Sequence, residues 1–300
     1  MAFYNEQWFI HQVSDNVTQL AQQKLSKVTG SVDVKEGVVG KSYPFQLIDK
    51  LEMTPANRDA PTQYLNASQG KRRAVMSDFN AFVLIDSLDT VKELADPQSA
   101  FAEALVRARN RRMDRYVLSP TGATVGGAIG AATVVDEAGE SFSTSALPSS
   151  QIIVNGATNL TLDKIRRAKL IMDLNDVDEE DRYFWYSPSG MMLSLLKDSQ
   201  VTSSDFNTIK ALSEGGFPVD GMWMGFKWRW SNLLPVSGTV RSCIAYQKQA
   251  IGLAVGTVRG VEIDKAVHMQ NSIQCGVMVS AGAVRKDDRG VVQVDIDESA

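Results

Sequence analysis

The sequence predicts an α+β fold in which a long helix separates an extended N-terminal part from a mixed body of helices and strands. Apolar residues recur at helical spacing over 96–118, and alternating residues flank a stretch of low hydrophobicity within 41–85. Short strand patterns with turn signals follow between 182 and 298.

The composition is that of a globular protein without a general attraction to nucleic acid. The 300 residues have 44% hydrophobic content and a net charge of −4, so any contact with nucleic acid needs a local basic patch. Cys243 and Cys275 lie far apart, and we expect them to be core residues of a protein made in a reducing compartment. Neither a signal peptide nor an apolar stretch of membrane-spanning length is recognisable.

The first 29 residues predict an amphipathic arm. Its apolar residues recur every three or four positions and its other positions are mostly Gln, Asn and Ser, so the arm needs a partner surface. A hinge of small residues follows at 30–40. The apolar positions are Trp8, Phe9, Val13, Val17, Leu20, Ala21 and Leu25.

Residues 41–85 predict a long hairpin. Tyr43, Phe45 and Leu47 alternate as in a strand, and 72–85 returns as a second extended segment. The stretch between them, 53–70, is polar and contains two prolines. The hairpin has too few apolar residues for its own core and is expected to be stable only against another surface.

The long helix is expected to begin with Asp96 as N-cap and Pro97 at the first position, and to end near Leu118. Five arginines fall within nine residues, and Asp114 is the only acid among them. We favour contacts between this arginine face and acidic loops of neighbouring subunits; a solvated face and a phosphate-binding face are the alternatives. The arginines are Arg107, Arg109, Arg111, Arg112 and Arg115.

The remaining elements are predicted from local patterns. We expect a buried strand at 183–186 and a single strand with a core face over 222–230. The acidic loop 175–181 is predicted to be solvated. Helices are predicted at 161–174, 188–197 and 246–256, and the last strands at 258–264 and 272–298 with a turn at 285–290.

The chain is poor in recognisable catalytic groups. His11 and His268 have no Cys, Asp or Glu at metal-ligand spacing, and the glycines of 122–131 match neither phosphate-loop pattern. We therefore predict no catalytic residue, cofactor or metal. Two alternatives stay open: a small-molecule α/β enzyme that uses the 175–207 region, and a nucleic-acid-binding protein that uses the arginine-rich helix.

Five segments, in this order, give the chain a family resemblance. They are KRRAVMSDFNAFVLIDSLD (71–89), DPQSAFAEALVRARNRRMDRYVLSPTG (96–122), SPSGMMLSLLKDSQVTSSDFN (187–207) with GFKWRWSNLLP (225–235), and AYQKQAIGLAVG (245–256). With the arm and hairpin before them, the chain resembles the major capsid proteins of tailed bacteriophages, which have the Hong Kong 97-like fold.

The resemblance implies a non-enzymatic shell protein that assembles through pentamers and hexamers into an icosahedral head around double-stranded DNA. Scaffolding, portal and decoration proteins would be its other partners, without any membrane, and it would be made in the cytoplasm of a bacterial host. The implied divisions are an N-terminal arm at 1–34, an extended loop at 35–90, a peripheral domain at 91–159 with 266–300 that includes the spine helix 96–118, and an axial domain at 160–265.

This reading also gives candidate contact residues between subunits. Trp8 and Phe9 would anchor the arm, and Phe45 and Tyr64 would anchor the loop. The five arginines of the long helix complete the set.

Overall fold

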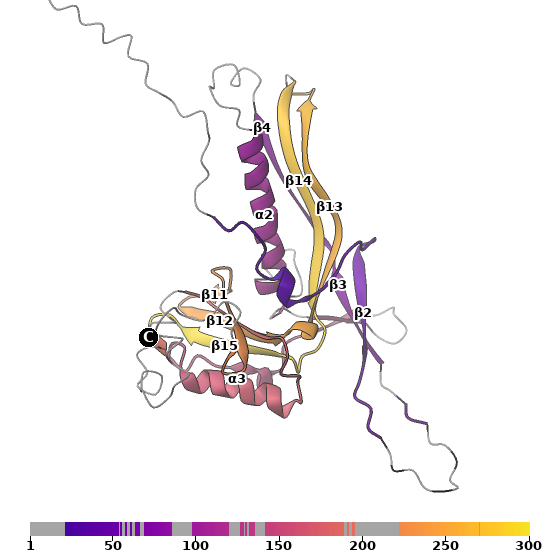
Figure 1. Cartoon of the computed structure of the whole chain (residues 1–300), viewed down its shortest axis with the longest axis vertical. Coiled ribbons are helices and arrows are strands. Elements are labelled where there is room, and N and C mark those ends of the chain that lie inside the picture. Colours follow the sequence, from indigo (N-terminus) through magenta and orange to yellow (C-terminus); the bar gives the residue numbers. More distant parts are fainter. Residues whose placement is uncertain are drawn as a thin grey trace, which may run out of the picture. The chain divides into compact units, whose positions relative to one another are not determined.

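The computed structural model contains two α-helices and three β-sheets in the part of the chain that it describes (Figure 1). The helices are α2 (Gln98–Leu118) and α3 (Leu162–Leu174), and the 3₁₀ turns are η2 (Thr29–Ser31), η3 (Ser149–Gln151) and η5 (Lys248–Ala250). The described residues are 22–53, 69–85, 98–119, 132–135, 142–188, 222–269 and 271–300, with residues 55, 58, 61, 64–66, 127, 128, 130, 191, 194 and 195.

The chain divides into two compact units. The first comprises 1–25, 79–111 and 258–279, and the second comprises 26–78, 112–257 and 280–300. Residues of both units occur in α2 and in three strands: β4 (Ser77–Ile85), β13 (Ile251–Ala266) and β14 (Ser272–Arg285).

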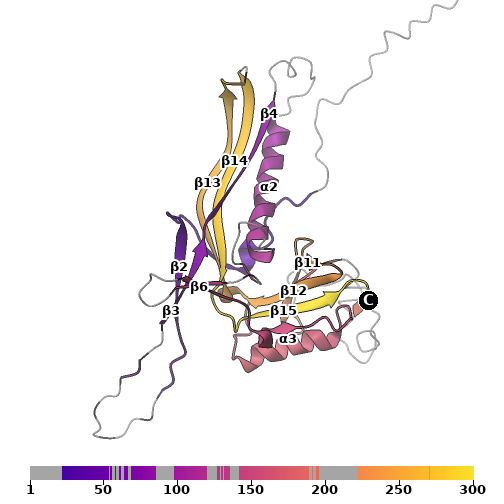
Figure 2. The ribbon, with the colours of Figure 1, turned by 180° about the vertical axis from the view of Figure 1, so that it is seen from behind.

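The first unit pairs an amphipathic sheet with the arginine-rich helix. Two long strands and β4 lie along α2, as Figures 1 and 2 show. Residues of β4 alternate between half-buried and exposed, so the strand has one face toward a core and one toward solvent. The core joins Ile85 and Leu105 to Cys275 and Val277. The strand order of the sheet is β1-β13-β14-β4; β1 (Asp33–Lys35) belongs to the second unit, where it pairs with residues 252–254 of β13.

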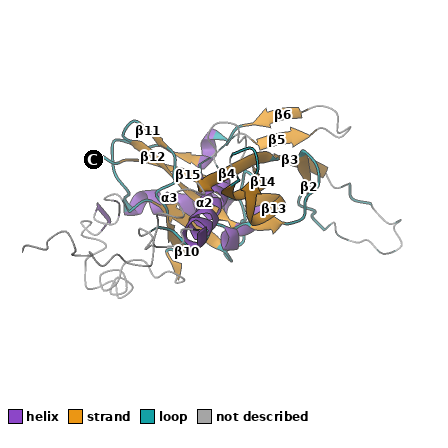
Figure 3. Ribbon diagram, turned by 90° about the horizontal axis from the view of Figure 1, so that it is seen from above, coloured by secondary structure: helices purple, strands orange, loops and turns teal. Residues whose placement is uncertain are grey.

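The hairpin predicted within 41–85 is confirmed in its first part. Strands β2 (Ser42–Ile48) and β3 (Gln69–Val75) pair antiparallel, from Ser42 opposite Val75 to Ile48 opposite Gln69. The predicted second segment, 72–85, is divided at Met76, because β3 stays in this sheet while β4 joins β14. Two short strands complete the hairpin sheet (Figure 3): β5 (Ala132–Val135) and β6 (Phe142–Ser145).

Gly282 allows strand β14 to pass close to the break between β3 and β4. A Cβ atom at Gly282 would lie 2.2 Å from the carbonyl oxygen of Val75 and 2.8 Å from its carbonyl carbon. Real Cβ atoms essentially never come so close to backbone atoms. The close approach of β14 to the β3–β4 break therefore depends on glycine.

Replacing Gly282 with alanine is expected to lower the free energy of unfolding by about 2 kcal/mol, because backbone atoms must shift. The matched control is Gly260→Ala in β13, where an added Cβ meets nothing within 4 Å. Urea denaturation of both variants measures the difference. Equal midpoints for the two would contradict the close-approach explanation.

The third sheet has the order β7-β15-β12-β8-β10-β9, with β11 beside β12. Its most buried strand is β8, whose five residues are all buried, and α3 packs against β15. In this sheet β15 pairs with β12, with 291–297 opposite 240–246. The predicted domain boundaries stay a prediction. The strands are β7 (Ile152–Ile153), β8 (Arg182–Tyr186), β9 (Met222–Trp223), β10 (Phe226–Trp230), β11 (Val236–Ser237), β12 (Val240–Gln247) and β15 (Val291–Asp297).

Two predicted elements are wrong. Residues 246–256 form no helix: β12 ends at Gln247, and β13 begins at Ile251 after a short 3₁₀ turn. Residues 222–230 are not one strand, because Met224 and Gly225 both have positive φ and fold the segment into a hairpin. Trp223 is consequently buried with Phe226 and Trp228, although a single strand would place it on the opposite face.

The helices predicted at 96–118 and 161–174 are confirmed as α2 and α3, and Thr161 caps α3 by accepting a hydrogen bond from the backbone of Lys164. The proposed caps Asp96 and Pro97 lie outside the described residues, as do the first 21 residues of the arm and most of 188–197. Among the described helices, none is long and apolar enough to cross a membrane.

Candidate functional site

The base of the long hairpin is fixed by a buried ion cluster. Asp288 accepts two hydrogen bonds of 2.7 Å from Arg72 of β3 and one of 2.5 Å from Arg285 of β14. Arg285 is completely buried and also donates to the carbonyl oxygens of Gly130 and Ser145. Burial disfavours the charged form of Asp288, but both guanidinium groups outweigh it and lower the pKa of this carboxyl group. The cluster joins three segments distant in sequence.

Phe45 contributes to the same base. It is buried, and its ring lies so close to Gly252 that a Cβ there would approach it to 2.6 Å. Phe45 packs with Val38, Ala74 and Val284 of its own chain. Phe45, which was predicted to anchor the loop in contacts between subunits, therefore holds the base of the hairpin against its own chain.

The distal part of the hairpin has the opposite character. Tyr64 is 92% exposed and Met53 is 98% exposed, and Leu51 and Leu65 are exposed as well. Two surface ion pairs hold the beginning of this segment: Lys50 with Asp176, and Asp49 with Arg289. We call residues 49–66 the loop tip. It presents large apolar side chains that the described part of its own chain does not cover.

The five arginines of α2 occupy different environments. Arg107 is buried and pairs with Glu103, whereas Arg115 is exposed. Arg111 donates to Gln22 at 2.5 Å, and the guanidinium of Arg112 lies 5.2 Å from the ring centre of Tyr116. Arg109 is half-buried. The arginines therefore do not form one uniformly solvated face.

The remaining predicted contact residues, Trp8 and Phe9, lie outside the described residues.

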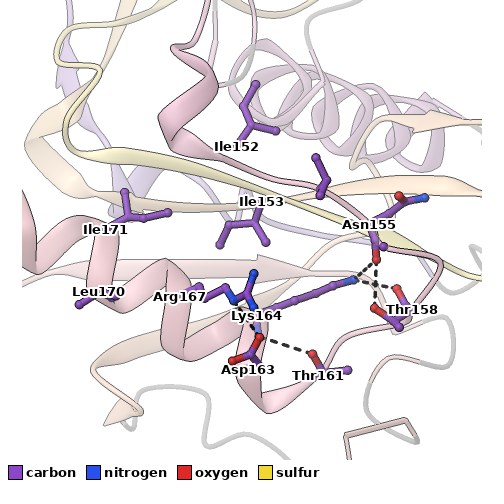
Figure 4. Close-up of a pocket in the computed structure, with 12 residues that line it drawn as sticks. Ile152, Ile153, Asn155, Thr158, Thr161, Asp163, Lys164, Arg167, Leu170 and Ile171 are labelled. Atoms are coloured by element: carbon purple, nitrogen blue, oxygen red, sulfur yellow. Dashed lines mark hydrogen bonds and ion pairs between the residues drawn. The ribbon is translucent and has the colours of Figure 1, made fainter.

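An open groove of about 560 Å³ runs between α3 and the strand β7 (Figure 4). Its charged side chains already have partners: Asp163 pairs with Arg167 at 2.8 Å. The buried ammonium of Lys164 turns away to backbone carbonyl oxygens, including those of Asn155 at 2.7 Å and Thr158 at 2.8 Å. These groups serve the structure of the turn, and the groove gives no support to the enzyme alternative.

The acidic loop 175–181 is mostly exposed, in agreement with the prediction, and two of its carboxylates have ion-pair partners. A hydrogen bond from Lys50 lowers the pKa of Asp176, and one from Lys227 lowers that of Asp181, so both carboxyl groups are ionised at neutral pH. Burial raises the pKa of Cys243 to about 12, which makes its thiol a poor nucleophile. No group of three metal-ligating side chains occurs in the described part of the chain.

Comparison with known proteins identifies the family of this chain. A model of the phage capsid protein family matches residues 6–298. The chain belongs to the phage capsid protein family. It is thus a major capsid protein of tailed-phage type, the subunit of an icosahedral shell.

Solved phage capsids have the same Hong Kong 97-like fold as this capsid protein. The native GTA particle capsid superposes with a TM-score of 0.72 at 11% identity, covering 98% of this chain and 97% of the other. The Ralstonia phage GP4 capsid gives 0.69 at 13% identity, covering 99% and 97%. The cyanophage P-SCSP1u capsid gives 0.67 at 16% identity, covering 96% and 93%. No curated protein sequence matches significantly.

Proposed function

We propose that this capsid protein assembles through pentamers and hexamers into a phage head that encloses double-stranded DNA, and that it has no enzymatic activity. The loop tip carries this proposal. A segment with an immobilised base and uncovered apolar side chains gains stability when it lies on a neighbouring subunit. The arm, with Trp8 and Phe9 as anchors, has the same need for a partner surface.

The proposed domain divisions, site of synthesis and partners are those that membership of the phage capsid protein family implies. The divisions into arm, extended loop, peripheral domain and axial domain are those expected above, with 266–300 in the peripheral domain. Synthesis takes place in the cytoplasm of the bacterial host, and scaffolding, portal and decoration proteins are the other partners. Contacts to packaged DNA are independent of its sequence.

Replacing Met53 and Tyr64 together with serine is expected to raise the subunit concentration needed for assembly at least about tenfold, because two interface anchors are lost. Sedimentation and negative-stain electron microscopy of the full chain measure shell formation. The control is Val267→Ser, an exposed apolar residue outside the loop tip. Unchanged assembly of the double variant would reject the loop tip as an interface. A wild-type chain that forms no capsomer or shell under any assembly condition would reject the proposed function.

The arginine face of α2 is proposed to contact neighbouring subunits. Arg112→Glu reverses one charge in this face and is expected to weaken assembly several-fold in the same sedimentation assay. Arg166→Glu, an exposed arginine of α3, is the control. Normal assembly of Arg112→Glu would contradict this role. If isolated subunits of the variant also lose salt-dependent DNA binding, that result would favour the alternative that the helix binds nucleic acid.

A further inference from the structure

Residues 26–31 are held against the body of the subunit by a buried carboxylate. Asp114 of α2 is 1% exposed. It accepts a hydrogen bond of 2.6 Å from the hydroxyl of Ser26 and bonds of 3.1 and 3.2 Å from the backbone N–H groups of Lys27 and Val28. An ionised acceptor forms stronger hydrogen bonds than a neutral one, so this single residue fixes the conformation of the 26–28 backbone.

A second contact comes from β10. The ammonium of Lys27 lies 3.0 Å from the centre of the Trp230 ring and donates to the Trp230 carbonyl oxygen at 3.1 Å. Burial is the main cause that lowers the pKa of Lys27, although the charge of Asp114 opposes it. The lysine head is therefore partly removed from water, which strengthens its cation–π contact with the half-exposed Trp230 ring.

A third contact comes from β12. The buried hydroxyl of Tyr246 lies 2.8 Å from the hydroxyl of Ser31, and it accepts a hydrogen bond of 2.8 Å from the indole N–H of Trp185. Ser31 donates to the carbonyl oxygen of Val28. The tyrosine hydroxyl therefore donates to Ser31, and the four groups form one directed chain. Val28 itself is buried.

We propose that residues 26–31, here called the arm base, form a rigid mount from which the N-terminal arm begins, and that Asp114 is its positioning residue. This inference rests on the proposed capsid function and deepens it. The contacts from α2, β10 and β12 approach the arm base from three elements, so the arm starts from the same fixed point in every subunit. A fixed starting point restricts which neighbouring copy the arm can reach, and so favours one shell geometry.

Limited trypsin digestion of the full chain tests the mount. Cleavage after Lys27 requires the arm base to open, whereas cleavage after the exposed Lys50 reports a site in the loop tip of the same molecule. Asp114→Ala is expected to raise the ratio of Lys27 to Lys50 cleavage at least about tenfold. Asp114→Asn, which keeps the size of the side chain, should give a smaller rise. The control Asp264→Asn removes an exposed carboxylate and should leave the ratio unchanged.

Electron microscopy of the same variants tests the consequence for assembly. Wild type and Asp264→Asn should form shells of one size, and Asp114→Ala should form mixed sizes and open sheets. An unchanged cleavage ratio in Asp114→Ala overturns the mount. Uniform shells from a variant with raised Lys27 cleavage overturn the link to shell geometry, while the capsid function stands. Absence of particles from the wild-type chain counts against the capsid function itself.

Discussion

Asp288→Asn is expected to lower the free energy of unfolding of the capsid protein by about 3 kcal/mol. The asparagine keeps the size of the side chain but loses the charge that two guanidinium groups share. Arg285 is fully buried and Arg72 is mostly buried, so both cations would remain in a poorly solvated site without their counter-ion. Urea denaturation monitored by tryptophan fluorescence measures the loss.

Asp287→Asn is the matched control, one residue away. Asp287 is well exposed and its ion pair with Arg289 spans 3.4 Å, while asparagine keeps the oxygen that accepts the 3.0 Å hydrogen bond from the Arg289 backbone. Its replacement should therefore change the free energy of unfolding by less than about 0.5 kcal/mol. If both variants lose equally little, the hairpin base is held by its apolar contacts and not by the ion cluster.

The same cluster predicts an acid dependence of stability. Because the folded pKa of Asp288 lies below its ordinary value of 3.8, the unfolded chain takes up the proton first as the pH falls. The stabilisation is therefore complete above pH 3.8 and is lost as the pH falls from there through the folded pKa. The difference in denaturation midpoint between wild type and Asp288→Asn should shrink as the pH falls from about 4 toward the folded pKa. A difference that stays constant over this range would contradict the assignment.

Local pattern was sufficient for elements whose partners are close in sequence. The stripe of α2 and the alternation around Phe45 predicted a helix and a strand that the structure contains. The apolar run ending at Gly256 was ambiguous, because a buried strand and a buried helix have the same composition there. The hairpin at Met224 and Gly225 carried only half of the usual turn signal, since glycine favours positive φ but methionine rarely adopts it.

The contacts that fix the arm and the loop could not be predicted from local pattern. Asp114 meets Lys27 across 87 positions, and Asp288 meets Arg72 across 216. Asp114 stands out in the sequence only as the single acid among five arginines, whereas in the structure it accepts hydrogen bonds from the backbone and a hydroxyl of the arm base. Such pairings depend on the tertiary fold, and one sequence contains no local signal for them.

Lys164→Met should lower the free energy of unfolding by about 2 to 4 kcal/mol, because buried acceptors beside the third sheet would lose a charged donor. The Lys164 ammonium donates to Asn155, Thr158, Asn159 and Asp295, whose carbonyl oxygens lie between 2.7 and 3.1 Å away. Methionine keeps the apolar stem and helix propensity but offers no donor. The carbonyl oxygens would then have to open the turn to water or remain unsatisfied.

Backbone strain in the turn at 156–157 explains why the loss of the Lys164 ammonium should lower the free energy of unfolding so much. Gly156 and Ala157 both have positive φ, a conformation that alanine rarely adopts without support from its surroundings. Arg166→Met removes an exposed cation from the same helix and should change the midpoint of urea denaturation little. Two amides report the turn: that of Asp297 donates to the Thr158 carbonyl oxygen at 3.0 Å, and that of Thr158 donates to Asn155 at 3.1 Å. Their hydrogen exchange should accelerate in Lys164→Met alone. Equal exchange in both variants would mean that the strand β15, rather than the lysine, holds the turn closed.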